Sequence, residues 1–177
     1  LCYFCFPENV TIIGQYAFSR TKLSGTLIIP DGVKLIGTSA FGSTNIGSIA
    51  FPTDVLFIAN SSFAGCSSLS GTLELPSNLL FIGSSAFNSC NFVGELHLPS
   101  NLEFIGGGAF CDAGNFVGGI TIPEKVSALH GRTFTSNKKA FSGVINLNNV
   151  TSIGDSEFAL SSFSGELVIP EGMQITI

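Results

Sequence analysis

The chain has 177 residues, of which 45% are hydrophobic and only 11% are charged, and its formal net charge is -5. Seven Lys and Arg residues cannot supply the clustered cations of a nucleic-acid surface, so we expect no nucleic-acid partner. No apolar run approaches the ~20 residues that a membrane-spanning helix needs, so no transmembrane segment is predicted.

One repeated unit accounts for the whole chain. An aliphatic residue lies five residues before each marker Phe, and Val or Leu lies three residues before that aliphatic. The marker residues, separated by 22 to 24 residues, are Phe18, Phe41, Phe63, Phe87, Phe110, Phe134 and Phe158. Several columns that recur together at such a period indicate a repeat solenoid. We therefore predict a single solenoid domain over residues 1–177, with about seven units of 22 to 24 residues.

Each unit begins with a predicted strand. Leu73–Leu75, Leu96–Leu98 and Ile120–Ile122 alternate apolar and variable residues, and a proline follows each of them. Strands of successive units should pair in parallel, because the chain between them is far longer than a hairpin loop. The result is a parallel β-sheet on one face of the solenoid.

The second half of each unit is predicted to turn back. The apolar positions Ile82, Ala86, Phe87 and Cys90 have spacings of four and five residues, which fits one short helical turn capped by Ser84 or Ser85. A glycine follows the aliphatic residue in most units, as Gly83 does here. It indicates either a bend that a side chain would crowd or a positive φ angle.

The two ends of the sequence are irregular. Phe4-Cys5-Phe6-Pro7 already matches the strand position, and Leu167-Val168-Ile169-Pro170 begins an eighth unit that stops at Ile177 before its Phe. We expect the sequence to be a piece of a longer array, because terminal repeats are usually atypical. The alternative is that open ends add strands head to tail and form a filament.

The unit of residues 71–90 reads Gly-x-Leu-x-Leu-Pro-x-x-Leu-x-x-Ile-Gly-x-x-Ala-Phe-x-x-Cys. This pattern resembles the BspA-type leucine-rich repeat of bacterial and protist surface proteins, and the resemblance covers essentially the whole chain. It implies a parallel sheet on one face of the solenoid, with short helical turns or extended segments on the other. It also implies an extracellular or cell-surface location and adhesion to host proteins or other cells. Ser62, Thr133 and Glu157 depart from the family's Ala, and the family's Cys is kept only at Cys66 and Cys90.

Residue types that carry catalysis do not converge in this sequence. His97 and His130 occupy different parts of the unit, and Glu74 and Glu95, on neighbouring strands, form an acidic patch rather than an acid/base pair in a cleft. Cys2-x-x-Cys5 has no second ligand pair for zinc. We predict a non-enzymatic protein with no catalytic residues, no metal site and no cofactor.

Two modifications remain open. Cys66 and Cys90 lie in the same column of consecutive units, so they are either two buried thiols or a disulfide between neighbouring coils. Asn9, Asn60 and Asn149 begin Asn-x-Ser/Thr sequons, which are glycosylation sites only if the source is a secreting eukaryote.

Two surfaces are candidates for binding. The variable positions of the predicted sheet would form a continuous face for a protein partner, host or self, or a cell-surface ligand; they include Thr72, Glu74, Glu95, His97, Thr121, Asn146 and Glu166. The residues just before the conserved aliphatic would form an apolar stripe, or would lie under a neighbouring loop; they include Leu35, Phe57, Phe81 and Phe104. Adhesion through the sheet face is the leading hypothesis. A structural subunit that self-associates through its ends and the stripe is the alternative.

Overall fold

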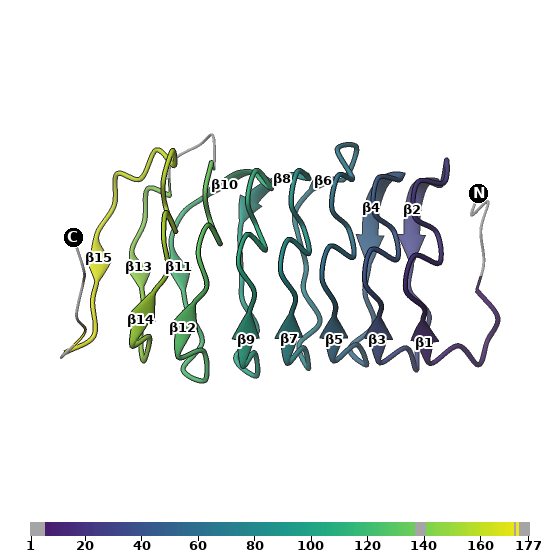
Figure 1. The fold of residues 1–177 in the computed structure, drawn as a ribbon, viewed down its shortest axis with the longest axis horizontal. Coiled ribbons are helices and arrows are strands. Elements are labelled where there is room, and N and C mark those ends of the chain that lie inside the picture. Colours follow the sequence, from purple (N-terminus) through teal and green to yellow (C-terminus); the bar gives the residue numbers. More distant parts are fainter. Residues whose placement is uncertain (1–5, 137–140, 172, 174–177) are drawn as a thin grey trace.

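The chain folds into a solenoid of coils stacked along one axis (Figure 1). The structure, a computed structural model, describes residues 6–136, 141–171 and 173. Every strand pair is parallel and joins one coil to the next. This confirms the predicted parallel solenoid.

The longest ladder consists of two-residue strands that end at the conserved aliphatic residue. It runs along the lower edge of Figure 1 as one sheet of five strands, followed by a pair. The strands are β1 (Ile12–Ile13), β3 (Leu35–Ile36), β5 (Phe57–Ile58), β7 (Phe81–Ile82) and β9 (Phe104–Ile105), then β12 (Ala128–Leu129) and β14 (Ser152–Ile153).

A second ladder, divided into three sheets, follows the opposite side of each coil. Its first sheet pairs β2 (Ser24–Ile28) with β4 (Asn45–Ala50). The second contains β6 (Ser70–Gly71), β8 (Asn91–Glu95) and β10 (Gly114–Val117), and the third contains β11 (Ile120–Thr121), β13 (Ile145–Asn146) and β15 (Leu167–Val168).

The predicted position of this second ladder is correct at β11 but wrong in two coils. Leu73–Leu75 and Leu96–Leu98 lie outside the strands, which begin earlier in those coils, at Ser70 and Asn91. The earlier segment carries the buried Phe92, whose ring stacks at 6.2 Å on Phe116 of the next coil. We attribute the shift in the coil of β8 to this aromatic anchor, and β6 pairs with β8 in the same register, with Gly71 opposite Phe92.

The predicted helical turn is also wrong, because Gly83–Cys90 forms successive β-turns. Ala86, Asn88 and Cys90 donate their N–H groups three residues back along the chain, whereas Ser85, Phe87 and Ser89 donate to carbonyls of the next coil. Ser85 and Ser89 have positive φ angles of 56° and 57°, as expected for the third residue of a type II turn. Alternate N–H groups therefore connect the coils, which a helix could not do.

The core is built around the column of marker Phe residues. Their rings stack from Phe18 to Phe158 at centroid distances of 5.3 to 5.7 Å, with interplanar angles of 3° to 9°. The five inner ones, Phe41 to Phe134, are fully buried. Val, Leu and Ile from both ladders enclose this column in one continuous core.

The glycine after the aliphatic residue is required by crowding rather than by a positive φ angle. A Cβ added at Gly106 would lie 2.3 Å from the backbone nitrogen of Ser84 in the preceding coil. A Cβ at Gly83 would lie 2.4 Å from the nitrogen of Asn60. The coils stack closely enough at this corner to leave no space for a side chain there.

Candidate interaction surfaces

The variable sheet face presents most of its predicted residues to solvent. Thr72, Glu74, Glu95, His97, Thr121 and Glu166 are exposed, and Asn146 is half-buried. The ladder aligns Thr121 with Asn146, and in the first coils it brings the hydroxyls of Thr26 and Ser48 to 2.8 Å. These positions therefore form rows of polar groups along the solenoid.

A cleft of about 350 Å³ interrupts this face between the coils of β8 and β11. Its lining residues are Glu95, Leu96, His97, Leu98, Gly119, Thr121 and Val144. The cleft lies where Glu95 pairs with Val117 and the next strand starts only at Ile120. Gly118, with a φ of +77°, lies in the gap between those two strands. The break in the ladder thus produces a concavity beside the predicted binding residues.

The cleft offers hydrogen-bonding groups rather than a reaction centre. Glu95 Oε2 lies 3.6 Å from His97 Nε2, and both side chains are largely exposed, so the pair is screened by solvent and contributes less than about 1 kcal/mol. Among the residues that the structure describes, no three His, Cys, Asp or Glu side chains gather to hold a metal ion. A partner would therefore meet a carboxylate, an imidazole and a hydroxyl beside apolar Leu98 and Val144.

The predicted apolar stripe lies on the longest ladder and varies in exposure. Ile12 is 60% and Phe57 41% exposed, while Leu35, Phe81 and Phe104 are half-buried. The rings of Phe81 and Phe104 stack at 4.7 Å, and His130 extends the stack at 4.9 Å from Phe104. His130 stands where most units have a glycine after the aliphatic residue, and the sequence did not connect it with the stripe.

A second apolar column beside the stripe was also missed. The N–H groups of Leu56 and Phe57 both donate to the Lys34 carbonyl, at 3.0 and 3.1 Å. The Lys34 carbonyl is thus a shared acceptor for two consecutive N–H groups, while the register of β3 and β5 stays one to one. Leu56 lies beside Phe57 outside the core, between the buried Val55 and Ile58. Two adjacent donors to one carbonyl are a property of the fold that residue spacing does not reveal.

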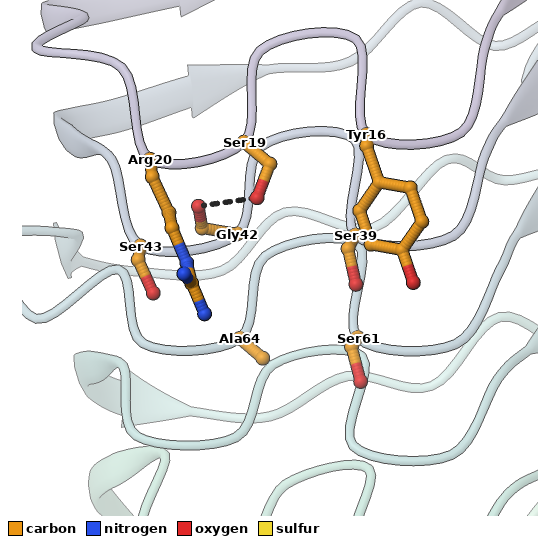
Figure 2. A pocket seen from close by; sticks show the side chains of 8 residues that line it. All are labelled: Tyr16, Ser19, Arg20, Ser39, Gly42, Ser43, Ser61 and Ala64. Atoms are coloured by element: carbon orange, nitrogen blue, oxygen red, sulfur yellow. Dashed lines mark hydrogen bonds between the residues drawn. The ribbon is translucent and has the colours of Figure 1, made fainter.

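The turn face has a shallow depression of about 470 Å³, with Tyr16 and Arg20 of one coil above Ser39, Ser43 and Ser61 of the next two (Figure 2). Small side chains at the turn tips leave this space, and Ser19 donates a hydrogen bond to the Gly42 carbonyl at 3.4 Å. Arg20 is the one charged side chain in its lining, so no group of charged residues converges there.

Cys66, Cys90 and the three sequon residues all lie in the described part of the chain. Cys66 and Cys90 are free, buried thiols, so the disulfide alternative is not formed in this structure. The physical reason is their orientation: each sulfur donates to a carbonyl of the preceding coil, Cys66 to Phe41 and Cys90 to Phe63. Burial raises the pKa of both thiols, which disfavours the reactive thiolate. The sequon residues Asn9, Asn60 and Asn149 are exposed, and Cys2-x-x-Cys5 lies outside the described residues.

Comparison with known proteins identifies the repeat. The family model of the BspA type leucine rich repeat region matches residues 1–116 and 71–176, with six copies. The chain belongs to the BspA-type leucine-rich repeat family. Repeat regions of this family are typically surface-associated, mediate protein interactions and are non-enzymatic. No curated protein sequence matches the chain.

A solved structure supports the same assignment. A leucine-rich repeat protein from Bacteroides ovatus ATCC 8483 is similar over 91% of this BspA-type chain, with 28% sequence identity and a TM-score of 0.74. The match covers 41% of that protein. The described part of the chain contains no helix that is long and apolar enough to cross a membrane.

Proposed function

We propose that this chain is a non-enzymatic interaction module of a cell-surface or secreted protein, and that it adheres to a protein partner through the variable sheet face. The observation that carries the proposal is the cleft beside Glu95, His97 and Thr121, where the ladder breaks between β8 and β11. The core residues of each coil are buried against neighbouring coils, so the exposed variable positions are the ones that can contact a partner.

The chemistry of the cleft favours a partner segment that donates hydrogen bonds. The exposed carboxylates of Glu74, Glu95 and Glu166 lie along the face, and the whole chain has a net charge of -5. A basic or amide-rich loop that also carries an apolar side chain would match the acidic rim and the apolar Leu98 and Val144.

The proposal is tested by filling the cleft. Thr121→Trp places a large side chain at an exposed strand position that tolerates aromatic residues. Binding of the purified chain to immobilised extracellular-matrix and serum proteins is measured by interferometry. We expect Thr121→Trp to weaken binding by at least about tenfold, which corresponds to about 1.4 kcal/mol.

Ala64→Trp is the matched control, because it fills the depression on the turn face instead (Figure 2). It should leave binding unchanged. Equal losses from both variants, or binding that ignores Thr121→Trp, would place the binding surface elsewhere.

A structural subunit is the second candidate function, and the exposure of Phe57 and Ile12 on the apolar stripe favours it. Light scattering with Phe81→Glu tests it: growth into polymers larger than a dimer that this substitution abolishes would support a structural role. A chain that stays monomeric with or without the substitution would leave adhesion as the remaining proposal.

A further inference from the structure

Four consecutive coils display a face that is two residues wide. Its positions, here called the stripe face, are Lys34-Leu35, Leu56-Phe57, Leu80-Phe81 and Glu103-Phe104. The shared-acceptor hydrogen bonds recur between these coils: paired N–H groups donate to the carbonyls of Lys34, Leu56 and Leu80. The same local geometry therefore holds both columns on the outside from coil to coil.

The first column of the stripe face has opposite charges at its two ends. In the order of the strands β3, β5, β7 and β9 it reads Lys34, Leu56, Leu80, Glu103. Lys34 and Glu103 are exposed, and the two leucines between them are half-buried. The second column, Leu35 to Phe104, is apolar throughout, with the Phe81–Phe104 stack at one end.

The order of charged and apolar residues in the first column is complementary to the same order read from the opposite end. Consider two copies that face each other across a twofold axis lying in the interface, parallel to the strands and between β5 and β7. The axis reverses the order of the coils but leaves each position along the strand unchanged. Lys34 then faces Glu103 of the second copy, and Leu56 faces Leu80. The second copy makes the same contacts in return, as an isologous interface requires.

Neighbouring charges continue the complementarity. Within one copy, Lys34 Nζ lies 2.6 Å from Asp54, and Lys125 Nζ lies 3.2 Å from Glu103. The two pairs have opposite polarity: the cation lies on the stripe face at one end and the anion at the other. Juxtaposed copies would therefore alternate Asp54, Lys34, Glu103 and Lys125, with no like charges adjacent.

We propose that the stripe face binds a second copy of this chain in antiparallel orientation, which forms a closed twofold dimer. The apolar columns provide the buried surface, and the Lys34–Glu103 contacts select the antiparallel register. A closed dimer differs from head-to-tail stacking, because both copies use the same surface and the interface is complete with two copies. The inference does not depend on partner binding at the variable sheet face.

The experiment inverts one charge pair while keeping it intact within each copy. The double variant Glu103→Lys/Lys125→Glu has an unchanged net charge and preserves the pair, but it presents a cation to Lys34 of the second copy. We expect its dimer dissociation constant, from sedimentation equilibrium, to rise at least about tenfold. Adding Lys34→Glu restores opposite charges across the interface, at the cost of the Lys34–Asp54 pair within each copy, and should recover part of the lost affinity.

Two controls show whether a change in dimer affinity comes from the contacts across the interface rather than from misfolding or from the change in net charge. Circular dichroism checks that each variant keeps the wild-type spectrum and melting temperature within a few degrees. Adding Lys22→Glu to the double variant makes the same charge change as Lys34→Glu but off the stripe face, and it should not restore dimers.

Three results would overturn the proposal. A wild-type chain that remains monomeric over the whole concentration series has no such interface. Dimers that ignore the inverted pair, or that Lys34→Glu fails to rescue, use another surface or register. Polymers that grow with concentration instead of stopping at a dimer indicate open head-to-tail assembly.

Discussion

The coil around Phe87 and the coil around Phe134 close the same corner with different residues. In the first, the Ala86 N–H donates to the carbonyl of Gly83 at 3.3 Å and closes a β-turn. In the second, His130 occupies the glycine position, and the Thr133 N–H donates at 2.8 Å to the carboxylate of Glu157, one coil later. The N–H of Gly131 donates to the other oxygen of the same carboxylate.

Two departures from the repeat thus compensate each other. A side chain at the glycine position opens the turn, and a long acceptor at the alanine position of the next coil takes over the freed N–H groups. Glu157 is only 3% exposed, so these hydrogen bonds offset part of the desolvation of its carboxylate. The regular coil closes its turn with a backbone hydrogen bond, whereas the variant coil depends on a side-chain acceptor from the next coil.

The largest expected difference between the two kinds of coil lies in the aromatic column. Phe87 is fully buried between Phe63 and Phe110, at 5.5 and 5.6 Å. Phe87→Ala should lower the free energy of unfolding by about 3–5 kcal/mol, because it removes buried area and leaves a cavity. Phe158 is half-buried next to Phe134. Phe158→Ala should therefore lower the free energy of unfolding by clearly less than Phe87→Ala does. Urea denaturation of both variants measures the difference, and equal losses would contradict the local account of the stack.

The glycine position gives the next largest effect. Gly106→Ala forces a Cβ to within 2.3 Å of the Ser84 nitrogen, in a coil with no compensating acceptor. We expect a loss of up to about 3 kcal/mol, typical of overpacking against a backbone that must shift. Gly14 occupies the same position in the first coil, and a Cβ there meets no described atom within 4 Å. Gly14→Ala should therefore leave the unfolding midpoint nearly unchanged, and a midpoint that falls as far as for Gly106→Ala would refute crowding as the cause.

The repeat period was sufficient to predict the solenoid, the parallel pairing of its strands and the Phe column. Each of these features follows from apolar residues that recur at the same spacing in every unit. The spacing failed at Gly83–Cys90, where apolar spacings of four and five suit a helix. The observed turns are selected by N–H groups that reach carbonyls of the next coil, such as Phe87 to Ala109 at 2.9 Å. That partner lies 22 residues away in sequence, so local spacing cannot distinguish the two conformations.

The sequence predicted which residues align along the candidate surfaces, but it did not predict the three-dimensional shape of those surfaces. Exposed Glu95 and Thr121 follow from strand alternation, whereas the cleft between them results from the break in the ladder after Val117. Similarly, Phe57 could be identified as outward from its neighbours Val55 and Ile58, but the hydrogen bond that holds Leu56 beside it depends on the carbonyl of Lys34 in another coil. His130 and Glu157 each depart from the repeat in the sequence. The sequence did not predict that Glu157 accepts hydrogen bonds from the coil that contains His130.

The smallest effect tests the compensation directly. Glu157→Ala should lower stability by about 1–3 kcal/mol, because it leaves the N–H groups of Gly131 and Thr133 without their acceptor. The double variant His130→Gly/Glu157→Ala restores the residues of a regular coil, and its turn can close on itself. The double variant should therefore be more stable than the sum of the two single changes predicts, by about 1 kcal/mol in a thermal or urea cycle. Strict additivity would mean that the two departures are independent.

The pH dependence of stability identifies the acceptor as a buried carboxyl. Burial raises the pKa of Glu157, although hydrogen bonds from Thr133 and Gly131 and the nearby His130 act in the opposite direction. A carboxyl whose pKa is higher in the folded than in the unfolded state binds its proton more tightly when folded. Its stabilising contribution is complete below the ordinary carboxyl pKa and is lost as the pH rises through the raised value. Glu157→Gln cannot titrate, so the stability of the wild type relative to this variant should fall from acidic toward neutral pH and then level off. A relative stability that rises over that interval would mean that the hydrogen bonds to the carboxylate outweigh its burial.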